Sequence, residues 1–175
     1  CVPIAMAQVM RYHQYPTNYN WSAMSPNDVT NTTANFINDI HNAIRTVYSG
    51  QPTYTCAATS VGSDKNMGTV LKTQFSYTTA DWSNYNYNTV VSNLDQGRPV
   101  ILSGDNGLKG HMWVCEGYRK STIYSEDCLT GWEFLHLYMN WGWDGWYNGY
   151  YSFNNFNPGN THYNNNNKMI YNIKP

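Results

Sequence analysis

The spacing of apolar residues changes near Gly97, and this change constrains the fold more than any other feature of the sequence. Before Gly97, apolar side chains recur at the three- and four-residue intervals typical of amphipathic helices. After it, they alternate with polar residues or form short runs bounded by Gly, Asn and Pro, as in strands. This order predicts an α+β protein, with a helical lobe at about 1–97 followed by a lobe of antiparallel sheet at about 98–175.

Four helices are expected in the first lobe. The first 14 residues have one apolar face, and a second helix is expected over about 28–48. A third should begin after Ser63, because a Ser hydroxyl is well suited to cap a helix N-terminus. A fourth, at about 88–96, should end before Gly97, since glycine favours the left-handed conformation that often follows a helix.

Strands are expected in the second lobe at 99–103, 111–118, 133–140, 147–153 and 169–173, separated by Gly-rich and Asn-rich loops that include 164–167. Within the third of these strands, Leu135, Leu137 and Met139 share one face, because successive side chains of a strand point to opposite sides. The sequence contains no internal repeat and no linker that would divide it. It is therefore predicted to form a single domain over 1–175.

Charged residues are scarce. Asp, Glu, Lys and Arg make up 12% of the chain, about half of the usual share, and the formal net charge is −1. This balance argues against nucleic acid or an anionic membrane surface as a partner. No apolar run is long enough to span a membrane. The 24 Asn, 16 Tyr and seven Trp residues favour a secreted or cell-surface protein. Because there is no initiating Met or signal peptide, the chain is expected to be part of a longer precursor.

Three residues in the order Cys, His, Asn suit a thiol hydrolase. Cys1 heads the first predicted helix, where free N–H groups and the helix dipole stabilise a thiolate. His111 follows a Gly-rich loop 110 residues later, and Asn140 lies 29 residues beyond it. In such a site the thiol attacks a carbonyl, the imidazole transfers the proton, and the amide oxygen holds the imidazole in place. Trp141 or Trp143 could shield that hydrogen bond from water.

Each of these features also has a plainer interpretation. A Cys at a chain start can be an accident of cleavage, and a His after a Gly-rich loop is more often structural than catalytic. The other His residues have no metal-ligand spacing, so neither a metal ion nor an organic cofactor is expected. Four Cys residues do not form a disulfide scaffold in a chain of this length. At most one bridge is expected, between Cys115 and Cys128, and it would leave Cys1 free.

Blocks of sequence along nearly the whole chain resemble the streptopain family of bacterial cysteine peptidases. They are CVPIAMAQVMRYHQYP at 1–16, YNW at 19–21, GRPVILSG at 97–104, GHMWVCEGY at 110–118 and MNWGWDGWYNGYYSF at 139–153, together with the ending at 155–158 and 173–175. The resemblance is weak between about 30 and 59.

The resemblance implies a papain-like fold and a cysteine-type endopeptidase, a thiol protease made as a secreted zymogen. Cys1 matches the nucleophile of the family, and His111 matches its general base and acid. Asn140 and Trp141 match the segment that orients and covers the His. The partners implied are protein or peptide substrates, and a propeptide or proteinaceous inhibitor.

The resemblance also concerns the substrate side of the site. Gly110 matches a glycine whose backbone borders bound substrate, and Ser60 resembles another substrate-binding position in a looser alignment. In the family, a segment upstream of the nucleophile supplies a glutamine to the oxyanion hole. The sequence given begins at the nucleophile, so this fragment is expected to be weakly active, since losing one such donor lowers the rate by about 10²–10³.

Two other functions stay open. An N-terminal-nucleophile amidohydrolase would use the amine of Cys1 as its base. Such enzymes place the nucleophile at the start of a strand in a two-sheet sandwich, which would leave His111 and Asn140 without a role. The second alternative is a catalytically inactive surface binding or adhesion domain on the same fold. The intact Cys/His/Asn set argues against that alternative.

Overall fold

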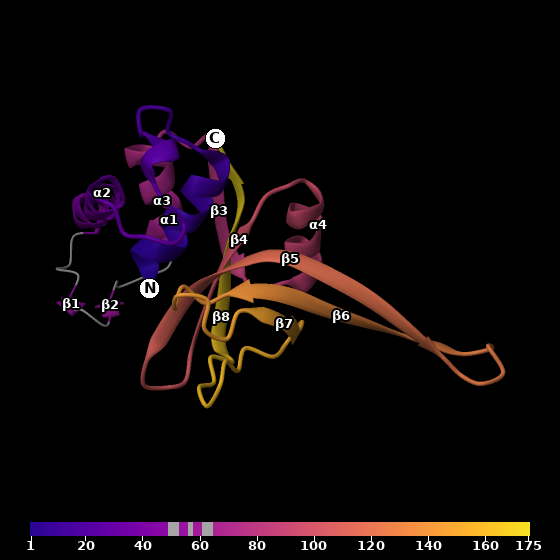
Figure 1. Ribbon diagram of the computed structural model, residues 1–175. Coiled ribbons are helices and arrows are strands. Elements are labelled where there is room, and N and C mark those ends of the chain that lie inside the picture. The colour runs from indigo at the N-terminus through magenta and orange to yellow at the C-terminus, as the bar shows by residue number, and fades with distance from the viewer. Residues whose placement is uncertain (49–52, 56–57, 61–64) are drawn as a thin grey trace.

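A six-stranded antiparallel sheet forms the centre of the molecule, and helices lie against both of its faces (Figure 1). The computed structural model describes residues 1–48, 53–55, 58–60 and 65–175, with the main chain alone at 53–55, 58–60 and 65. The strand order is β3-β8-β4-β5-β6-β7, and a separate pair is formed by β1 and β2. The helices are α1 (Val2–His13), the 3-10 helix η1 (Trp21–Ala23), α2 (Asn31–Val47), α3 (Lys65–Gln74) and α4 (Tyr87–Asp95). The strands are β1 (Thr53–Thr55), β2 (Ala58–Ser60), β3 (Thr79–Asn84), β4 (Val100–Asp105), β5 (Gly110–Tyr124), β6 (Gly131–Asn140), β7 (Gly149–Ser152) and β8 (Asn165–Lys174).

Alternation along the central strands divides the core between the two faces of the sheet. In β4, Ile101 packs in a cluster with α1, α2 and α3, whereas Val100 and Leu102 pack in a second cluster with α4. In β5, Met112 belongs to the first cluster and Trp113 to the second. Both faces are therefore buried, and the α+β class predicted from the sequence is confirmed.

The helices begin and end where the sequence provides caps. The hydroxyl of Thr30 accepts a hydrogen bond from the main-chain N–H of Thr33 at the start of α2. The side chain of Asn86 does the same for the N–H of Asn88 in α4, and Gly97 follows that helix with φ +68°. These caps satisfy groups that a helix end leaves free. The predicted helices at the chain start, in α2 and in α4 are confirmed within a few residues.

The structure differs from the predictions at β3 and at residues 164–167. β3 pairs along β8 as the edge of the sheet, so the expectation of helices alone before Gly97 is wrong there. Only Ala80 of β3 is buried, and an edge strand with one buried side chain has little apolar alternation to recognise. Ser63 lies outside the described residues, although α3 itself is present. The predicted loop at 164–167 is mostly strand, because β8 begins at Asn165.

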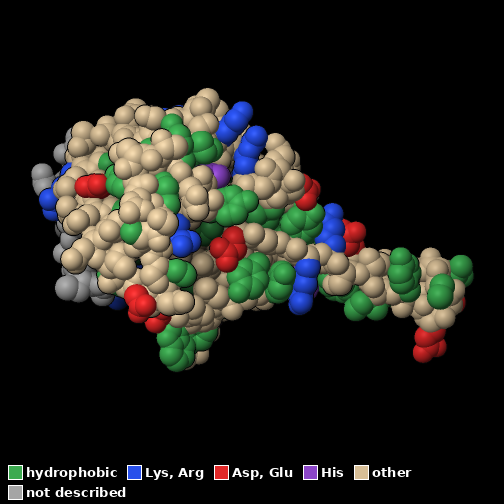
Figure 2. Space-filling view, turned by 45° about the horizontal axis from the view of Figure 1, so that its top comes forward, with side chains coloured by type: hydrophobic (Ala, Val, Ile, Leu, Met, Phe, Trp, Pro, Cys, Tyr) green, Lys and Arg blue, Asp and Glu red, His purple; other side chains and the backbone are tan. Residues whose placement is uncertain are grey.

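β5 and β6 continue beyond the sheet as a two-stranded arm, residues 119–135 (Figure 1). Lys120 and Glu133 form a diagonal ion pair across it, with 3.6 Å between the amine and the carboxylate. Figure 2 shows hydrophobic side chains along the arm and at its end. The exposed apolar residues are Ile123, Tyr124, Leu129, Trp132 and Phe134. The outer part of the arm is therefore held by its own ladder, whereas Leu135 at its base is buried in the second cluster.

Cys115 and Cys128 are free, so the suggested bridge between them is not formed. Cys115 is buried in the sheet and pairs with Met139 of β6. Cys128 is exposed in the turn at the far end of the arm. The length of the arm separates the two thiols, which the sequence spacing of 13 residues does not reveal.

Candidate functional site

Cys1 stands at the N-cap position of α1, as the helical pattern predicts. Its side chain makes no capping hydrogen bond, and it is partly buried against the cluster that α1, α2 and α3 form. The thiol is therefore at the end of the helix where free N–H groups and the dipole favour a negative charge. This arrangement does not fit the N-terminal-nucleophile alternative, which requires Cys1 at the start of a strand.

His111 lies near the start of β5, in an aromatic cluster that excludes water. Its side chain is only 7% exposed. The ring of Trp143 stacks on it with centroids 4.7 Å apart, and Tyr163 lies 5.2 Å away. Trp113 and Trp141 lie further out, at 6.1 and 6.2 Å. The rings of Trp141 and Trp143 both stack against the imidazole, although the Asn140–imidazole hydrogen bond that they were expected to shield is not the one formed.

The imidazole is held by a main-chain group. Nε2 of His111 lies 2.9 Å from the carbonyl oxygen of Trp141, at the end of β6. A carbonyl oxygen can only accept, so Nε2 carries the proton and donates it. In the neutral ring Nδ1 is then unprotonated, with its lone pair free to take a proton. The contact thus selects the tautomer that a general base needs.

Asn140 does not take the place that the sequence analysis gave it beside the imidazole. Its side-chain oxygen accepts hydrogen bonds from Nε2 of Gln8, at 3.0 Å, and from the main-chain N–H of Gly142, at 3.1 Å. The bond to Gly142 closes a tight turn around Trp141. Because this turn directs the Trp141 carbonyl towards His111, Asn140 contributes to the site by shaping the turn.

Burial makes His111 a weak base. Desolvation lowers the pKa of the imidazole to about 4, and the hydrogen bond to Trp141 opposes this effect only in part. The imidazole is therefore neutral at pH 7. α1, whose N-cap is Cys1, and β5, which carries His111, lie against each other.

We expect the protein to lose stability in acid because of His111. Its folded pKa of about 4 lies below the ordinary value of 6.5, so the unfolded chain binds the proton more readily. This contribution is complete above pH 6.5 and is lost as the pH falls towards 4, by about 3 kcal/mol. Urea unfolding at pH 7 and pH 4 measures it.

His111→Phe is the matched control for this measurement, because a phenyl ring can occupy the same aromatic cluster. Burial also lowers the pKa of His13 and His41. The difference in unfolding free energy between the protein and the variant cancels their contribution. If that difference is the same at pH 7 and pH 4, His111 is not a buried neutral base.

The two substrate-side positions remain predictions. Gly110 is exposed, begins β5 and immediately precedes His111. Ser60 ends β2, where it pairs with Thr53, and β2 lies against α1. Gly110 thus lies on the strand that carries His111, and Ser60 lies on a strand next to the helix that begins at Cys1.

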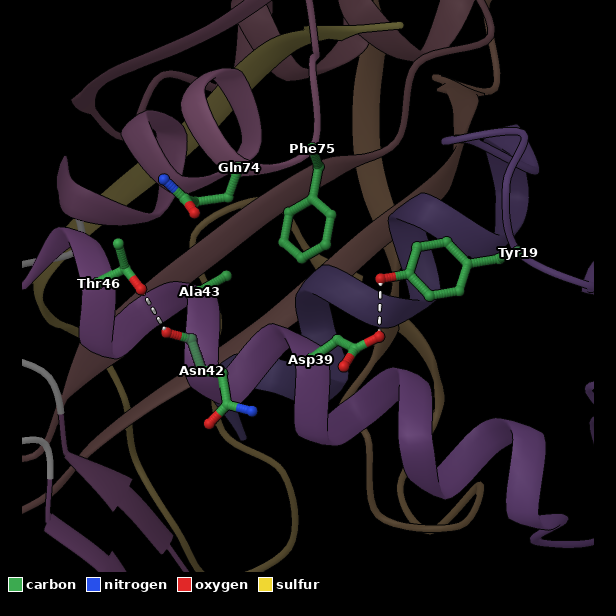
Figure 3. Close-up of a pocket in the computed structure, with 7 residues that line it drawn as sticks. All are labelled: Tyr19, Asp39, Asn42, Ala43, Thr46, Gln74 and Phe75. Carbon is green, nitrogen blue, oxygen red and sulfur yellow. Dashed lines mark hydrogen bonds between the residues drawn. The ribbon is translucent and has the colours of Figure 1, made fainter.

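A separate hollow of about 270 Å³ lies on the helical side of the molecule (Figure 3). It is lined by Tyr19, Asp39, Asn42, Ala43, Thr46, Gln74 and Phe75. The hydroxyl of Tyr19 donates to Asp39 at 3.0 Å, and that of Thr46 donates to the main-chain oxygen of Asn42 at 3.0 Å. Several of its polar groups are therefore paired with each other, and none of the described site residues lines it.

In the described part of the chain, no three His, Cys, Asp or Glu side chains gather closely enough to hold a metal ion. Nor does any helix within these ranges have the length and apolar character needed to cross a membrane.

Sequence reasoning missed Gln8, Glu116 and Tyr163. Glu116 accepts a hydrogen bond from the Asn140 side chain, and Tyr163 covers one side of the imidazole. Gln8 had a recognisable signal, since it is the one polar residue in VPIAMAQVM, two helical turns after Cys1. Glu116 and Tyr163 gave none, because a strand irregularity and a distant loop bring them to the site.

The sequence matches a family of known proteins. The sequence model of the Peptidase C10 family matches residues 17–151. Streptopain of Streptococcus pyogenes is 26% identical over 197 residues, covering 90% of this chain and 46% of its own length. The thiol protease/hemagglutinin PrtT of Porphyromonas gingivalis is 23% identical over 206 residues, covering 91% of this chain and 21% of its own. The chain thus spans less than half the length of these curated relatives.

Two solved structures share the fold. The active interpain A cysteine protease of Prevotella intermedia superposes with a TM-score of 0.75 at 23% identity, covering all of this chain and 83% of its own. A fragment of prointerpain A from the same organism gives a TM-score of 0.66 at 22% identity, covering 99% of this chain and 62% of its own. The papain-like fold expected from the sequence is confirmed.

Proposed function

Because the chain belongs to the Peptidase C10 family, we propose that it is the catalytic part of a cysteine endopeptidase, with Cys1 as nucleophile and His111 as general base and acid. The resemblance to the streptopain family is confirmed by this membership and by the matching relatives. The observation that carries the proposal is the hydrogen bond from His111 to the Trp141 carbonyl, because it leaves the other ring nitrogen ready to accept a proton.

The chemistry follows from these groups. Nδ1 of His111 takes the thiol proton, and the sulfur of Cys1 attacks the peptide carbonyl to form a thioester while the imidazolium protonates the leaving amine. Neutral His111 then activates a water molecule, whose attack releases the acid and regenerates the thiol. Trp143 and the rest of the aromatic cluster keep bulk water from the ring. Gly110 and Ser60 border the substrate.

The substrates, partners and location are part of the same proposal. The substrates are proteins or peptides, and the protein is secreted as a zymogen with an inhibitory propeptide. The solved prointerpain A fragment supports the propeptide, since its name denotes a pro-form of a protein with the same fold. A sequence of low charge that is rich in Asn and Tyr supports secretion.

Cleavage of an unfolded protein tests the proposal. The protein, expressed from its complete reading frame and allowed to mature, is expected to degrade casein under reducing conditions. A thiol-directed epoxide inhibitor should block this activity by alkylating Cys1, whereas a metal chelator should leave it unchanged. If no peptidase or amidase activity is found under these conditions, the enzymatic proposal fails. A binding or adhesion domain on the same fold then becomes the leading explanation.

A further inference from the structure

Gln8 connects the helix that carries Cys1 to the turn that holds His111. Cys1, Ile4 and Gln8 recur along one side of α1, since seven residues make about two helical turns. Nε2 of Gln8 donates to the side-chain oxygen of Asn140 at 3.0 Å. Gly142 lies against the same side of the helix, where a Cβ on it would be 3.2 Å from Ile4. The turn and the helix are thus in direct contact.

The hydrogen-bonding pattern determines how both amides are oriented. The main-chain N–H of Gly142 can only donate, so the oxygen of the Asn140 side chain must face it. Gln8 approaches the same oxygen and must therefore present its NH₂ group. The NH₂ group of Asn140 is then left to donate to the carboxylate of Glu116. No other orientation of the Asn140 amide satisfies all three contacts.

Glu116 brings a third element into this arrangement. It lies at the irregularity in the pairing of β5 with β6, between Cys115 and Gly117. An extra residue of this kind re-aims a side chain. Since β5 also carries His111, the hydrogen bonds of the Asn140 side chain connect α1, the turn at Trp141 and β5.

The other end of the Gln8 amide adds no hydrogen bond to the site. Its Oε1 is buried and has no hydrogen-bond partner among the residues that the structure describes. A buried acceptor without a partner destabilises the folded state, whereas an apolar side chain of similar size carries no such penalty. Replacing Gln8 by an apolar side chain of similar length is therefore expected to cost little stability, so the effect of losing its Nε2 donor can be measured separately.

We propose that Gln8 is a positioning residue, which sets the distance between the thiol of Cys1 and the imidazole of His111 through the side chain of Asn140. The proposal rests on the proposed function, in which these two groups react together. Gln8 itself touches neither substrate nor the reacting atoms. Its effect is on the geometry of proton transfer and not on substrate binding.

Gln8→Met in the mature protein from the complete reading frame is the main test. The side chain keeps its length and loses its donor, so we expect kcat per titrated active site to fall about 10- to 100-fold. KM should stay within about twofold, because substrate contacts are unchanged. The urea midpoint should stay the same or rise, because the unpaired Oε1 is removed. A residue with a structural role alone would lower stability and leave kcat per site unchanged.

Two further variants sharpen the test. Arg11→Met is the matched control: Arg11 lies near the other end of α1 and donates to the main-chain oxygen of Met24 at 2.9 Å. Arg11→Met should lower the urea midpoint and leave kcat unchanged.

Gln8→Glu introduces a carboxyl group, which cannot donate a hydrogen bond to Asn140 when it is ionised but can when it is protonated. Its kcat relative to the unchanged protein should therefore recover as the pH falls from 8 to 5, where His111 is still neutral.

Alkylation of Cys1 by iodoacetamide at pH 6 separates this inference from the proposed function. Slower alkylation of Cys1 in Gln8→Met supports the positioning role, whether or not peptidase activity is found. If the protein has no peptidase activity, only the proposed function fails. If Gln8→Met is alkylated as fast as the unchanged protein, with kcat within twofold, the inference is overturned. Equal losses of kcat in Gln8→Met and Arg11→Met also overturn it, since they indicate general loosening of α1.

Discussion

We expect Cys1→Ser to lower kcat/KM for peptide substrates by a factor on the order of 10⁴ or more while leaving the fold intact. The substitution changes one atom, so packing at the start of α1 is retained. The chemistry is lost because His111, with a pKa of about 4, is a weak base. A base of this strength can share the proton of a thiol but has little capacity to remove one from an alcohol.

The measurement is peptide hydrolysis together with circular dichroism of both proteins. Cys128→Ser serves as the control, because Cys128 is a free, exposed thiol at the end of the arm. It should keep full activity. Cys1→Ser with more than about a hundredth of the original rate would mean that another group is the nucleophile.

Gly104→Ala is expected to destabilise the protein by about 3 kcal/mol or more. Gly104 lies in β4 opposite His111. A Cβ there would collide with the main-chain oxygen of Tyr163 and with the side-chain nitrogen of Asn167, and its distance to the carbonyl carbon of Tyr163 would be 3.2 Å. The colliding oxygen belongs to the backbone and cannot rotate away. The segment around Tyr163 must therefore move, and the movement takes the ring of Tyr163 away from the imidazole of His111.

Gly110→Ala is the matched control in the same hairpin. A Cβ on Gly110 would lie 3.6 Å from the main-chain oxygen of Gly104, which is ordinary van der Waals contact. Urea unfolding of both variants makes the comparison, and Gly110→Ala should unfold within about 1 kcal/mol of the unchanged protein. Equal stability of the two variants would mean that the segment at 163–167 moves aside easily at this point.

The fold could be predicted largely because its main elements carry local signals. α1 and α2 show helical spacing. In β6 the shared face predicted for Leu135, Leu137 and Met139 is confirmed, and all three side chains are at most 9% exposed. β3 could not be predicted in this way, because its pairing with β8 depends on residues about 90 positions away. An edge strand that buries one side chain has no periodicity of its own.

The candidate site could be predicted in its residues but not in its contacts. The order Cys1, His111, Asn140 indicated the chemistry, and the structure brings their segments together. The partner of the imidazole was assigned to the wrong group, since a side-chain amide is visible in a sequence and a main-chain carbonyl is not. Gln8 was passed over because a single polar residue on an apolar helix face has many explanations.

The main-chain partner of His111 has a consequence in genetic terms. Every amino acid contributes the same carbonyl, so no codon change at position 141 can remove the acceptor that orients the imidazole. Substitution there alters the packing around the ring and the shape of the turn, but the acceptor atom itself persists. The identity of the residue at 141 is therefore a poor guide to whether this hydrogen bond exists in another chain. The shape of the turn, which Asn140 and Gly142 determine, is a better guide to whether the hydrogen bond exists.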